Sequence, residues 1–495
     1  MFKRLLLVLF VSFSVQAQET GSDEETPVSH DQIAGEQSLT VARPWRAPIY
    51  NDQQGALGWS EEAFAVPAGL ETQVKFWIDI YSKYTTDQGV LHDAENIDMI
   101  YEEIDFSPIV ARTDLNVFQK ERLKEKHLKE KRAYYTAILK KLHTVKSGED
   151  LTGDEKRLWD YFQKVDEPKK FLEAAGKNRM RFQLGQRDRM IQGIFFSGRY
   201  LEEFEKIFRE FGVPIELTRM VFVESSFNVL ARSKVGASGL WQIMPSTMKM
   251  YHRKSDVVDM RNHPVAATRM AARVLRMNYN QLKAWPLAVT GYNHGPTGIQ
   301  KLTKRYNTRD IGELVKNVQS RKSFGFASRN FYASFLAALE VERNAPRYLG
   351  NVTWSQTLDD VELKLPKAVQ YSDLVRWFGG DDLRAQVFNP HITRLARRGK
   401  KSLPGGVIIS VPKAQLSAIE KELESSESLK LARQTDVENQ PQSSGSEKVK
   451  EYKVRRGDNL NRISAKFGVP VKEILAANNL ESPNEIKSGQ VLKIP

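Results

Sequence analysis

The 495-residue chain contains no cysteine. This absence excludes disulfide bonds and thiolate-bound metals, and it leaves no cysteine in this sequence to carry a lipid anchor. The eight histidines include no His-Glu-x-x-His spacing. Neither a phosphate-binding glycine loop followed by Lys-Ser or Lys-Thr nor a Gly-x-Ser-x-Gly turn occurs. We therefore expect neither a metal nor a cofactor.

Long apolar runs are scarce too. The N-terminal run, residues 5–11, is too short to span a bilayer, which takes about 18 or more apolar residues. It follows two basic residues and precedes a small residue, Ala17, which is the pattern of a secretory signal. We expect residues 1–17 to be a signal peptide and the protein to reach the periplasm or cell envelope, not as a lipoprotein. Residues 18–65 are expected to form a disordered acidic leader.

Charge of one sign does not gather in long blocks, although the formal net charge is +13. Basic and acidic residues alternate, as in residues 120–132, and on a helix such a run is usually a solvated face with ion pairs between turns. We therefore expect no nucleic-acid partner. For an exported basic protein, the polyanion is the cell wall or the membrane surface. With 41% hydrophobic and 27% charged residues, the chain is typical of a soluble protein of two or three domains.

Apolar residues recur at helical spacing over much of the chain. Within residues 66–180, Trp77 and Tyr81 lie on one such stripe, and the pattern predicts an N-terminal helical arm. Residues 181–345 continue as helices with short loops, and Pro214 marks one helix start. These patterns predict a fold class that is mainly α.

The C-terminal part has a different pattern. Residues 359–412 contain two strand-like segments around two short helical ones, and residues 451–495 follow the order strand, helix, helix, strand. Between them, residues 424–448 are rich in Ser, Gln and Asn, which predicts a flexible linker. Residues 451–495 closely resemble a LysM module, a small α+β (βααβ) domain, and the resemblance implies binding to glycans that contain N-acetylglucosamine. The earlier block resembles a degenerate LysM module, and the alternative is a connector with a chance αβ pattern.

One carboxylate, Glu224, has surroundings that suit catalysis. It follows the apolar run 217–223, which is also predicted to be helical, and the next acidic residue is Asp256. A carboxyl against an apolar wall has a raised pKa and keeps a proton near neutral pH. The small residues within 231–239 let a bulky ligand approach the backbone. Side chains that can stack on a sugar or hydrogen-bond to it come next: Trp241, Gln242 and Tyr251.

The residues around Glu224 form a series of motifs. Glu224-Ser-Ser-Phe227 is followed by Gly236-Ala-Ser-Gly-Leu-Trp-Gln-Ile-Met-Pro-Ser-Thr247 and by Ala288-Val-Thr-Gly-Tyr-Asn-His-Gly295. In this order they resemble the motifs of the soluble-lytic-transglycosylase family, over roughly residues 181–345. The resemblance implies a lysozyme-like α-helical catalytic domain with Glu224 as its acid. Without the motifs, Glu224 would be interpreted as a helix-end carboxylate paired with Arg219.

The resemblance also implies a reaction that needs a single acid/base. Glu224 would protonate the glycosidic oxygen between N-acetylmuramic acid and N-acetylglucosamine. It would then take the proton of the C6 hydroxyl that closes a 1,6-anhydro ring. Hydrolytic glycosidases generally use two carboxylates instead. A hydrolytic lysozyme of the goose type and a non-catalytic cell-wall-binding protein are the alternatives. The implied partner is the peptidoglycan glycan strand, bound at the cell wall by a monomer.

Further residues match positions that contact substrate in that family. Ser233 and Gln242 match sugar contacts near the acid, and each could instead make a hydrogen bond within its loop. Tyr292 and Asn293 resemble groups that line the site opposite the acid. Their alternative interpretation is a core tyrosine and a helix-cap asparagine.

A later family motif appears here in altered form, as Ala327-Ser-Arg-Asn-Phe-Tyr332. The motif's glutamate is lost, and its tyrosine falls on Phe331. Either Tyr332 takes over by a shift of one position, or this part of the site lacks the hydroxyl.

Overall fold

The chain divides into two compact units, Met1–Ile419 and Glu420–Pro495. The computed structural model describes residues 40–41, 64–252, 255–318, 323–424, 450–455, 458–467, 469–480, 482–483 and 485–494. The predicted signal peptide, residues 1–17, lies outside the described residues, as do nearly all of 18–65 and of 424–448. Within the described part of the chain, no helix is both long and apolar enough to cross a membrane.

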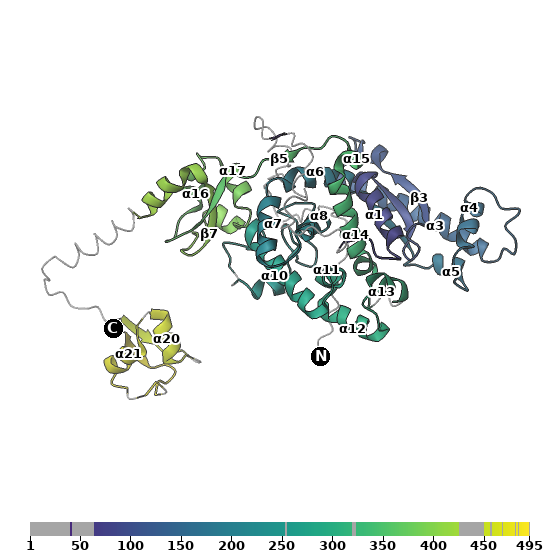
Figure 1. Ribbon diagram of the computed structural model, residues 1–495. Helices are drawn as coiled ribbons and strands as arrows, with labels where there is room; N and C mark the ends of the chain where they lie inside the picture. The colour runs from purple at the N-terminus through teal and green to yellow at the C-terminus, as the bar shows by residue number, and fades with distance from the viewer. Residues whose placement is uncertain are drawn as a thin grey trace. The chain divides into compact units, whose positions relative to one another are not determined.

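The centre of the first unit is a cluster of helices around α14, Phe326–Arg343. α14 is buried along most of its length, because α1 (Glu71–Ser82), α8 (Met220–Ser225) and α11 (Trp285–His294) all pack against it (Figure 1). Pro214 precedes the first turn of η4, as the sequence predicted. The elements of this cluster, besides α1 and α14, are α6 (Arg187–Ser197), α7 (Leu201–Glu210), η4 (Ile215–Arg219), α8 (Met220–Ser225), α9 (Pro245–Lys249), α10 (Pro264–Leu282), α11 (Trp285–His294), α12 (Pro296–Tyr306), α13 (Ile311–Asn317) and α15 (Ala345–Leu349).

Helix α1, Glu71–Ser82, belongs to this central core. Trp77 is fully buried, and its indole Nε1 donates a hydrogen bond to Asn330 Oδ1 on α14 at 3.2 Å. Tyr81, one turn later, is buried in the same core. The apolar stripe for which we predicted a separate arm is therefore the face through which α1 packs against the central helices.

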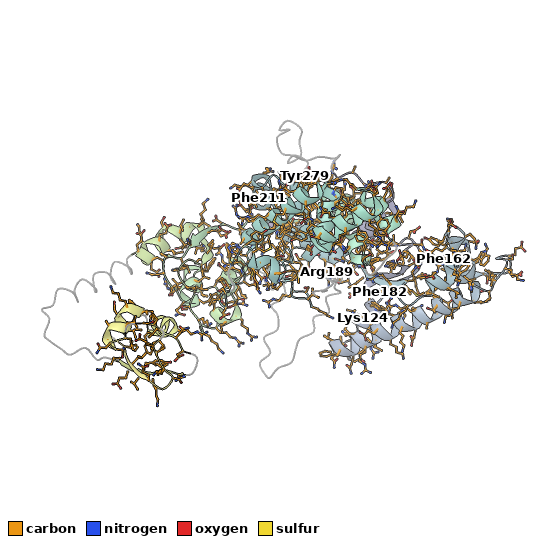
Figure 2. The ribbon with its side chains drawn as sticks, turned by 90° about the horizontal axis from the view of Figure 1, so that it is seen from below. Lys124, Phe162, Phe182, Arg189, Phe211 and Tyr279 are labelled. Atoms are coloured by element: carbon orange, nitrogen blue, oxygen red, sulfur yellow. The ribbon has the colours of Figure 1, made fainter. Side chains whose placement is uncertain are left out.

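Residues 66–180 are not all helical, which corrects the prediction for this stretch. Three strands form an antiparallel sheet in the order β3-β2-β4: β2 (Gln88–Asp93), β3 (Ile100–Asp105) and β4 (Met180–Leu184). Five of the six residues of β2 are buried, so its sequence lacks the alternation that marks a strand with one solvent face. Residues in the sheet and the helices beside it form a second core, in the part where Figure 2 labels Phe162 and Phe182. Those helices are α2 (Ser107–Val110), α3 (Val117–Leu142), α4 (Gly153–Phe162) and α5 (Lys170–Ala174).

Two described parts of 18–65 differ from the predicted disordered leader. Strand β1, Thr40–Val41, pairs antiparallel with β5, Trp354–Ser355. Phe64 is buried in the central core, with its ring 5.7 Å from that of Phe335. The prediction is wrong at these residues.

Residues 360–412 form a small block at the end of the first unit. Strands β6 (Asp360–Lys364) and β7 (Ile408–Pro412) pair antiparallel, and α16 (Tyr371–Trp377) and α17 (Asp382–Phe388) lie between them in the chain. A further short helix, α18 (Arg394–Arg397), follows α17.

The second unit repeats that order without the extra helix. Strands β8 (Lys450–Lys453) and β9 (Val491–Ile494) pair antiparallel around α20 (Leu460–Phe467) and α21 (Val471–Ala477). The unit has its own small core, with Leu460, Ile474 and Leu492 fully buried. The predicted fold class, mainly α with a small α+β module at the C-terminus, is confirmed.

Candidate active site

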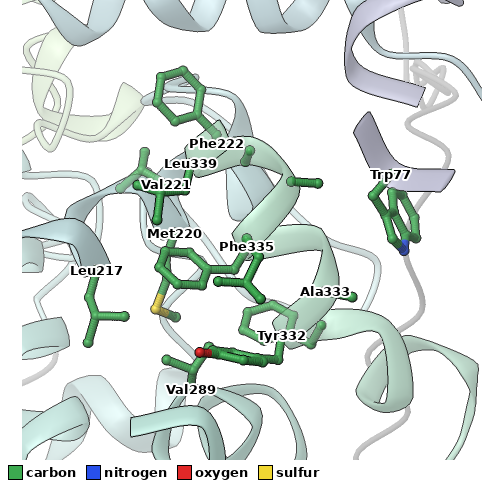
Figure 3. Packing of buried hydrophobic residues seen from close by; sticks show 14 of the residues in the cluster. Trp77, Leu217, Met220, Val221, Phe222, Val289, Tyr332, Ala333, Phe335 and Leu339 are labelled. Atoms are coloured by element: carbon green, nitrogen blue, oxygen red, sulfur yellow. The ribbon is translucent and has the colours of Figure 1, made fainter. Parts of the chain in front are cut away.

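Glu224 lies in the last turn of α8, close to where the helix ends. The helix stops because Ser226 and Phe227 both have a left-handed backbone, with φ of 49° and 59°. The turn before Glu224 is apolar: Met220, Val221 and Phe222 are fully buried, and Figure 3 shows them packed near the α14 side chains. The local sequence thus places one carboxyl at the end of an apolar wall.

The charge of Glu224 is not offset by Arg219. The Arg219 guanidinium is buried and pairs with Glu205 and with Glu342, the latter at 3.3 Å. The interpretation of Glu224 as the partner of Arg219 is therefore wrong. Glu224 itself keeps part of its surface exposed, and burial of the rest raises the pKa of its carboxyl to about 8. At neutral pH this group is mostly protonated and can donate a proton.

The loop after Glu224 is held in shape by its own hydrogen bonds. Ser225 Oγ donates to Leu240 O at 2.8 Å, which ties the loop to the end of α8. Ser233 Oγ accepts from the Ala237 amide at 2.9 Å. Gln242 Nε2 donates to the carbonyls of Ala231 and Gly239. Both predicted sugar contacts, Ser233 and Gln242, thus make the loop hydrogen bonds of the alternative interpretation, and both side chains also keep partial exposure.

Tyr292 is brought next to Glu224 from α11. Its hydroxyl donates to Trp241 O at 2.9 Å, so α11 is also tied to the loop. Burial, together with the nearby negative charge of Glu224, raises the pKa of Tyr292 well above its usual value. Asn293 is almost fully buried, and its Oδ1 accepts from Ser328 Oγ of α14 at 3.0 Å. The observed bond of Asn293 is therefore a link between two helices.

Tyr81 approaches Glu224 from α1, and the sequence analysis assigned it no place in the site. Its hydroxyl lies near Ser334 on α14 and within range of the charge of the Glu224 carboxylate. Burial, and to a smaller extent that charge, raises the pKa of Tyr81. A tyrosine on an amphipathic helix looks like an ordinary core residue, so no sequence signal distinguished it.

Two further predicted contacts, Tyr332 and Tyr251, pack against other side chains. Tyr332 is only 1% exposed and packs in the α14 core, where Figure 3 shows it beside Val289. Phe331 is buried as well, so neither residue presents a surface to a ligand in this structure. The Tyr251 hydroxyl contacts Met277 Sδ of α10 at 3.5 Å, and the Arg273 guanidinium lies 5.5 Å from its ring.

The next acidic residues along the chain have other partners. Asp256 is exposed and pairs with Lys401 at 2.9 Å. Asp259 pairs with Arg261 through two hydrogen bonds, at 2.9 and 2.6 Å. Burial alone would raise the pKa of Asp259, but the hydrogen bonds and charge of Arg261 outweigh it and lower the pKa. Asp259 therefore stays ionised in a structural ion pair.

No group of three His, Asp or Glu side chains that could hold a metal ion occurs among the residues with described positions. The expectation that neither metal nor cofactor takes part stays a prediction.

Two family profiles match the chain. Residues 206–315 match the Transglycosylase SLT domain, and residues 452–495 match the LysM domain. The first match contains Glu224, its loop and Tyr292, whereas Tyr81 lies outside it. Residues 360–412 fall outside both matches.

Individual proteins are similar to parts of the chain. The chain is 28% identical over 287 residues to the membrane-bound lytic murein transglycosylase D of Escherichia coli strain K12, which is 57% of this chain and 60% of that protein. It is 39% identical over 79 residues to the N-acetylmuramoyl-L-alanine amidase XlyB of Bacillus subtilis, covering 16% of this chain and 22% of the amidase. The crystal structure of the 70 kDa soluble lytic transglycosylase SLT70 from Escherichia coli aligns over 46% of this chain and 45% of its own, at 16% identity and a TM-score of 0.25.

Proposed function

We propose that this chain, which carries an SLT domain and a LysM domain, is a lytic transglycosylase that cleaves peptidoglycan glycan strands. The observation that carries the proposal is a single carboxyl, Glu224, with a pKa of about 8 at the end of an apolar helix inside the SLT match. A general acid works best when its pKa lies near the working pH. The similarity to a lytic murein transglycosylase over 57% of this chain supports the same substrate class.

In the proposed reaction, protonated Glu224 donates its proton to the oxygen that links C1 of N-acetylmuramic acid to N-acetylglucosamine. The bond from C1 to that oxygen breaks, and the substrate's own N-acetyl group shields the positive charge that develops at C1. Ionised Glu224 then removes the proton of the C6 hydroxyl, whose oxygen bonds to C1. The product is a 1,6-anhydro-N-acetylmuramic acid end, and Glu224 is protonated again. Its raised pKa suits both steps, because burial favours return to the neutral acid.

The surroundings of Glu224 support non-hydrolytic cleavage. An inverting or retaining hydrolase generally places a second carboxylate opposite the acid. Asp256 and Asp259, the next acidic residues in the chain, are engaged by Lys401 and Arg261. The hydroxyls of Tyr81 and Tyr292 lie near Glu224, and we infer that these neutral dipoles orient the carboxyl without ionising it.

The LysM module, residues 452–495, would hold the enzyme on its insoluble substrate. Tethering raises the effective concentration of glycan at the site without changing the chemistry at Glu224. We infer that the protein is exported and acts as a monomer at the wall.

Mass spectrometry of the fragments released from purified sacculi tests the proposal. We expect fragments with 1,6-anhydro ends, lighter by one water than fragments with reducing ends. Predominantly reducing ends would move the assignment to a hydrolytic lysozyme. Release of no fragments at all, with binding to sacculi intact, would leave a non-catalytic wall-binding protein.

A further inference from the structure

The 360–412 block and the C-terminal LysM module share internal hydrogen bonds as well as element order. In the block, Asn389 Nδ2 donates to the carbonyls of Ala385 and Ser410, and its Oδ1 accepts from the Ser410 amide at 2.7 Å. In the LysM module, Asn478 makes the same three bonds, to the carbonyls of Ile474 and Lys493 and from the Lys493 amide. One asparagine thus clamps the second helix to the last strand in both.

The ends of the loops before the last strands also agree. Gly406 donates its amide to Leu365 O at 2.7 Å, and Gly489 donates to Val454 O at 2.8 Å. Both glycines have a positive φ, 87° and 93°, which favours glycine at this turn. The similarity supports a LysM-type fold for residues 360–412, a block that lies outside both family matches.

The two modules differ in the loop between the clamp asparagine and the last strand. It runs over 389–406 in the block and over 478–489 in the LysM module, and the longer loop contains α18. The longer loop pairs with residues 256–259 of the central part. Asp259 donates its amide to His391 O at 2.7 Å, and Thr393 donates its amide to Val257 O at 2.9 Å. Val258 and Ile392 form an antiparallel bridge between these two bonds.

Side chains reinforce this contact. Thr393 Oγ1 donates to Asp256 O at 2.7 Å, and the Lys401 ammonium pairs with the Asp256 carboxylate. The His391 ring packs against the His263 ring with centroids 4.5 Å apart, and both rings are buried. The loop 389–406 is thus held against the central part of the first unit by both backbone and side-chain contacts.

Residues 259–262 also contact the active-site loop, residues 236–243. Arg261, held by Asp259, donates from Nη1 to Gly236 O at 2.6 Å. Asn262 Oδ1 accepts from Ser238 Oγ at 2.7 Å. A Cβ on Gly239 would lie 2.0 Å from Arg261 O, so the backbones of Gly239 and Arg261 pack directly against each other. The same loop binds Ser225, next to Glu224, through Leu240 O.

We propose that residues 360–412 are a LysM-type module that braces the active-site loop instead of tethering the protein to glycan. Its loop 389–406 holds residues 256–259 in place through backbone pairing. Residues 256–259 in turn position Arg261 and Asn262. Arg261 and Asn262 then hydrogen-bond to the loop 236–243 beside Glu224. Thr393 is then a positioning residue for the reaction, and the role of the block rests on the proposed function.

Thr393→Val tests this directly, because it keeps the shape of the side chain and removes only the hydroxyl that donates to Asp256 O. We expect kcat on short soluble glycan fragments to fall about 3- to 10-fold, with KM within about twofold and pelleting with sacculi unchanged. Thr393→Ser retains a hydroxyl and should restore kcat. Amide hydrogen exchange of residues 231–243 should become faster in Thr393→Val, a readout that does not need activity and so separates this proposal from the proposed function.

The clamp asparagines supply a matched pair. Asn389→Ala should lower kcat on soluble fragments and speed exchange in residues 231–243. Asn478→Ala should weaken pelleting with sacculi and leave exchange in 231–243 as in the wild type. The bracing role is overturned if Thr393→Val leaves both kcat and exchange within about twofold of the wild type. It is equally overturned if Thr393→Val or Asn389→Ala weakens pelleting while kcat on soluble fragments stays unchanged, since that result assigns glycan binding to the block.

Discussion

The two βααβ regions, residues 360–412 and 450–494, share an element order and an asparagine clamp but belong to different compact units. The first belongs to the same compact unit as Glu224, and the second belongs to a unit of its own. The difference lies in one loop, 389–406, whose backbone pairs with residues 257–259. In the roles that we propose for the two modules, a small fold keeps its internal hydrogen bonds while a longer loop changes its role from a tether to a brace.

The same comparison separates two kinds of contribution to a reaction at a surface. A tether acts through effective concentration, so its loss affects only an insoluble substrate. A brace acts through geometry, so its loss affects every substrate. Comparing soluble fragments with intact sacculi therefore separates a tether from a brace.

The largest effect is expected for Glu224→Gln, which sets the scale for both substrates. The amide cannot donate or accept the proton, and loss of acid–base catalysis typically costs about 10²–10⁴ in rate. Fragment release from sacculi and turnover of soluble glycan should fall together, while pelleting with sacculi is retained. Near-normal release by this variant would show that Glu224 is not the acid.

Ending the chain after Glu424 should produce the next largest effect, on sacculi alone. The truncation removes the LysM module and keeps the whole 360–412 block. Loss of a tether can lower apparent affinity by about 10²-fold or more without changing a contact at the site. We expect weak pelleting and unchanged kcat on soluble fragments. A parallel loss of soluble turnover would contradict the division of roles between the two modules.

Arg261→Lys should cost about tenfold in kcat on both substrates, with pelleting unchanged. Arg261 binds Asp259 through two nitrogens and Gly236 O through a third, and a lysine ammonium cannot reproduce that planar arrangement. Arg276→Lys is the matched control, because Arg276 makes a single bond to a carbonyl, Gly212 O, on the surface. Equal kcat values for the two variants would show that Arg261 does not connect the 360–412 block to the active-site loop.

Glu224→Gln should also change stability in a way that depends on pH. The pKa of Glu224 is 4.5 in an ordinary environment and about 8 in the folded protein. Between these values the unfolded chain releases a proton that the folded chain retains, so the wild type loses stability as pH rises through this window. The variant lacks this loss. Its melting temperature should match the wild type near pH 4 and exceed it at pH 8, measured by calorimetry. No such divergence would contradict a raised pKa at Glu224.

The smallest effect is expected for Tyr81→Phe. Removing the hydroxyl takes a polar group away from Glu224, so the pKa of the carboxyl should rise further and kcat on soluble fragments should fall about 2- to 5-fold. The alkaline limb of the pH–rate profile should move to higher pH. Tyr279→Phe is the control, because Tyr279 stacks on Trp285 in α10 and α11. An unshifted limb with Tyr81→Phe would mean that α1 only packs against α14.

Local sequence patterns were enough to predict much of the fold and the centre of the site. The 3.6-residue stripe predicted α1 and the long helices, and Pro214 marked the start of η4, because these features depend on neighbours in the chain. The apolar run before Glu224 predicted the wall that raises its pKa. The sheet β3-β2-β4 was missed because β2 is buried on both faces and does not alternate.

The sequence by itself therefore determined the carboxyl of Glu224 at the end of an apolar helix, the mainly helical class and the C-terminal LysM module. Only the tertiary structure decided that the Tyr81 hydroxyl lies within range of the Glu224 charge from outside the SLT match, that Tyr332 is buried, and that residues 389–401 pair with 256–259. The first and the last of these arrangements join residues more than a hundred positions apart. Their formation depends on how whole helices and strands pack, and hydrophobic spacing records only which face of each element is buried.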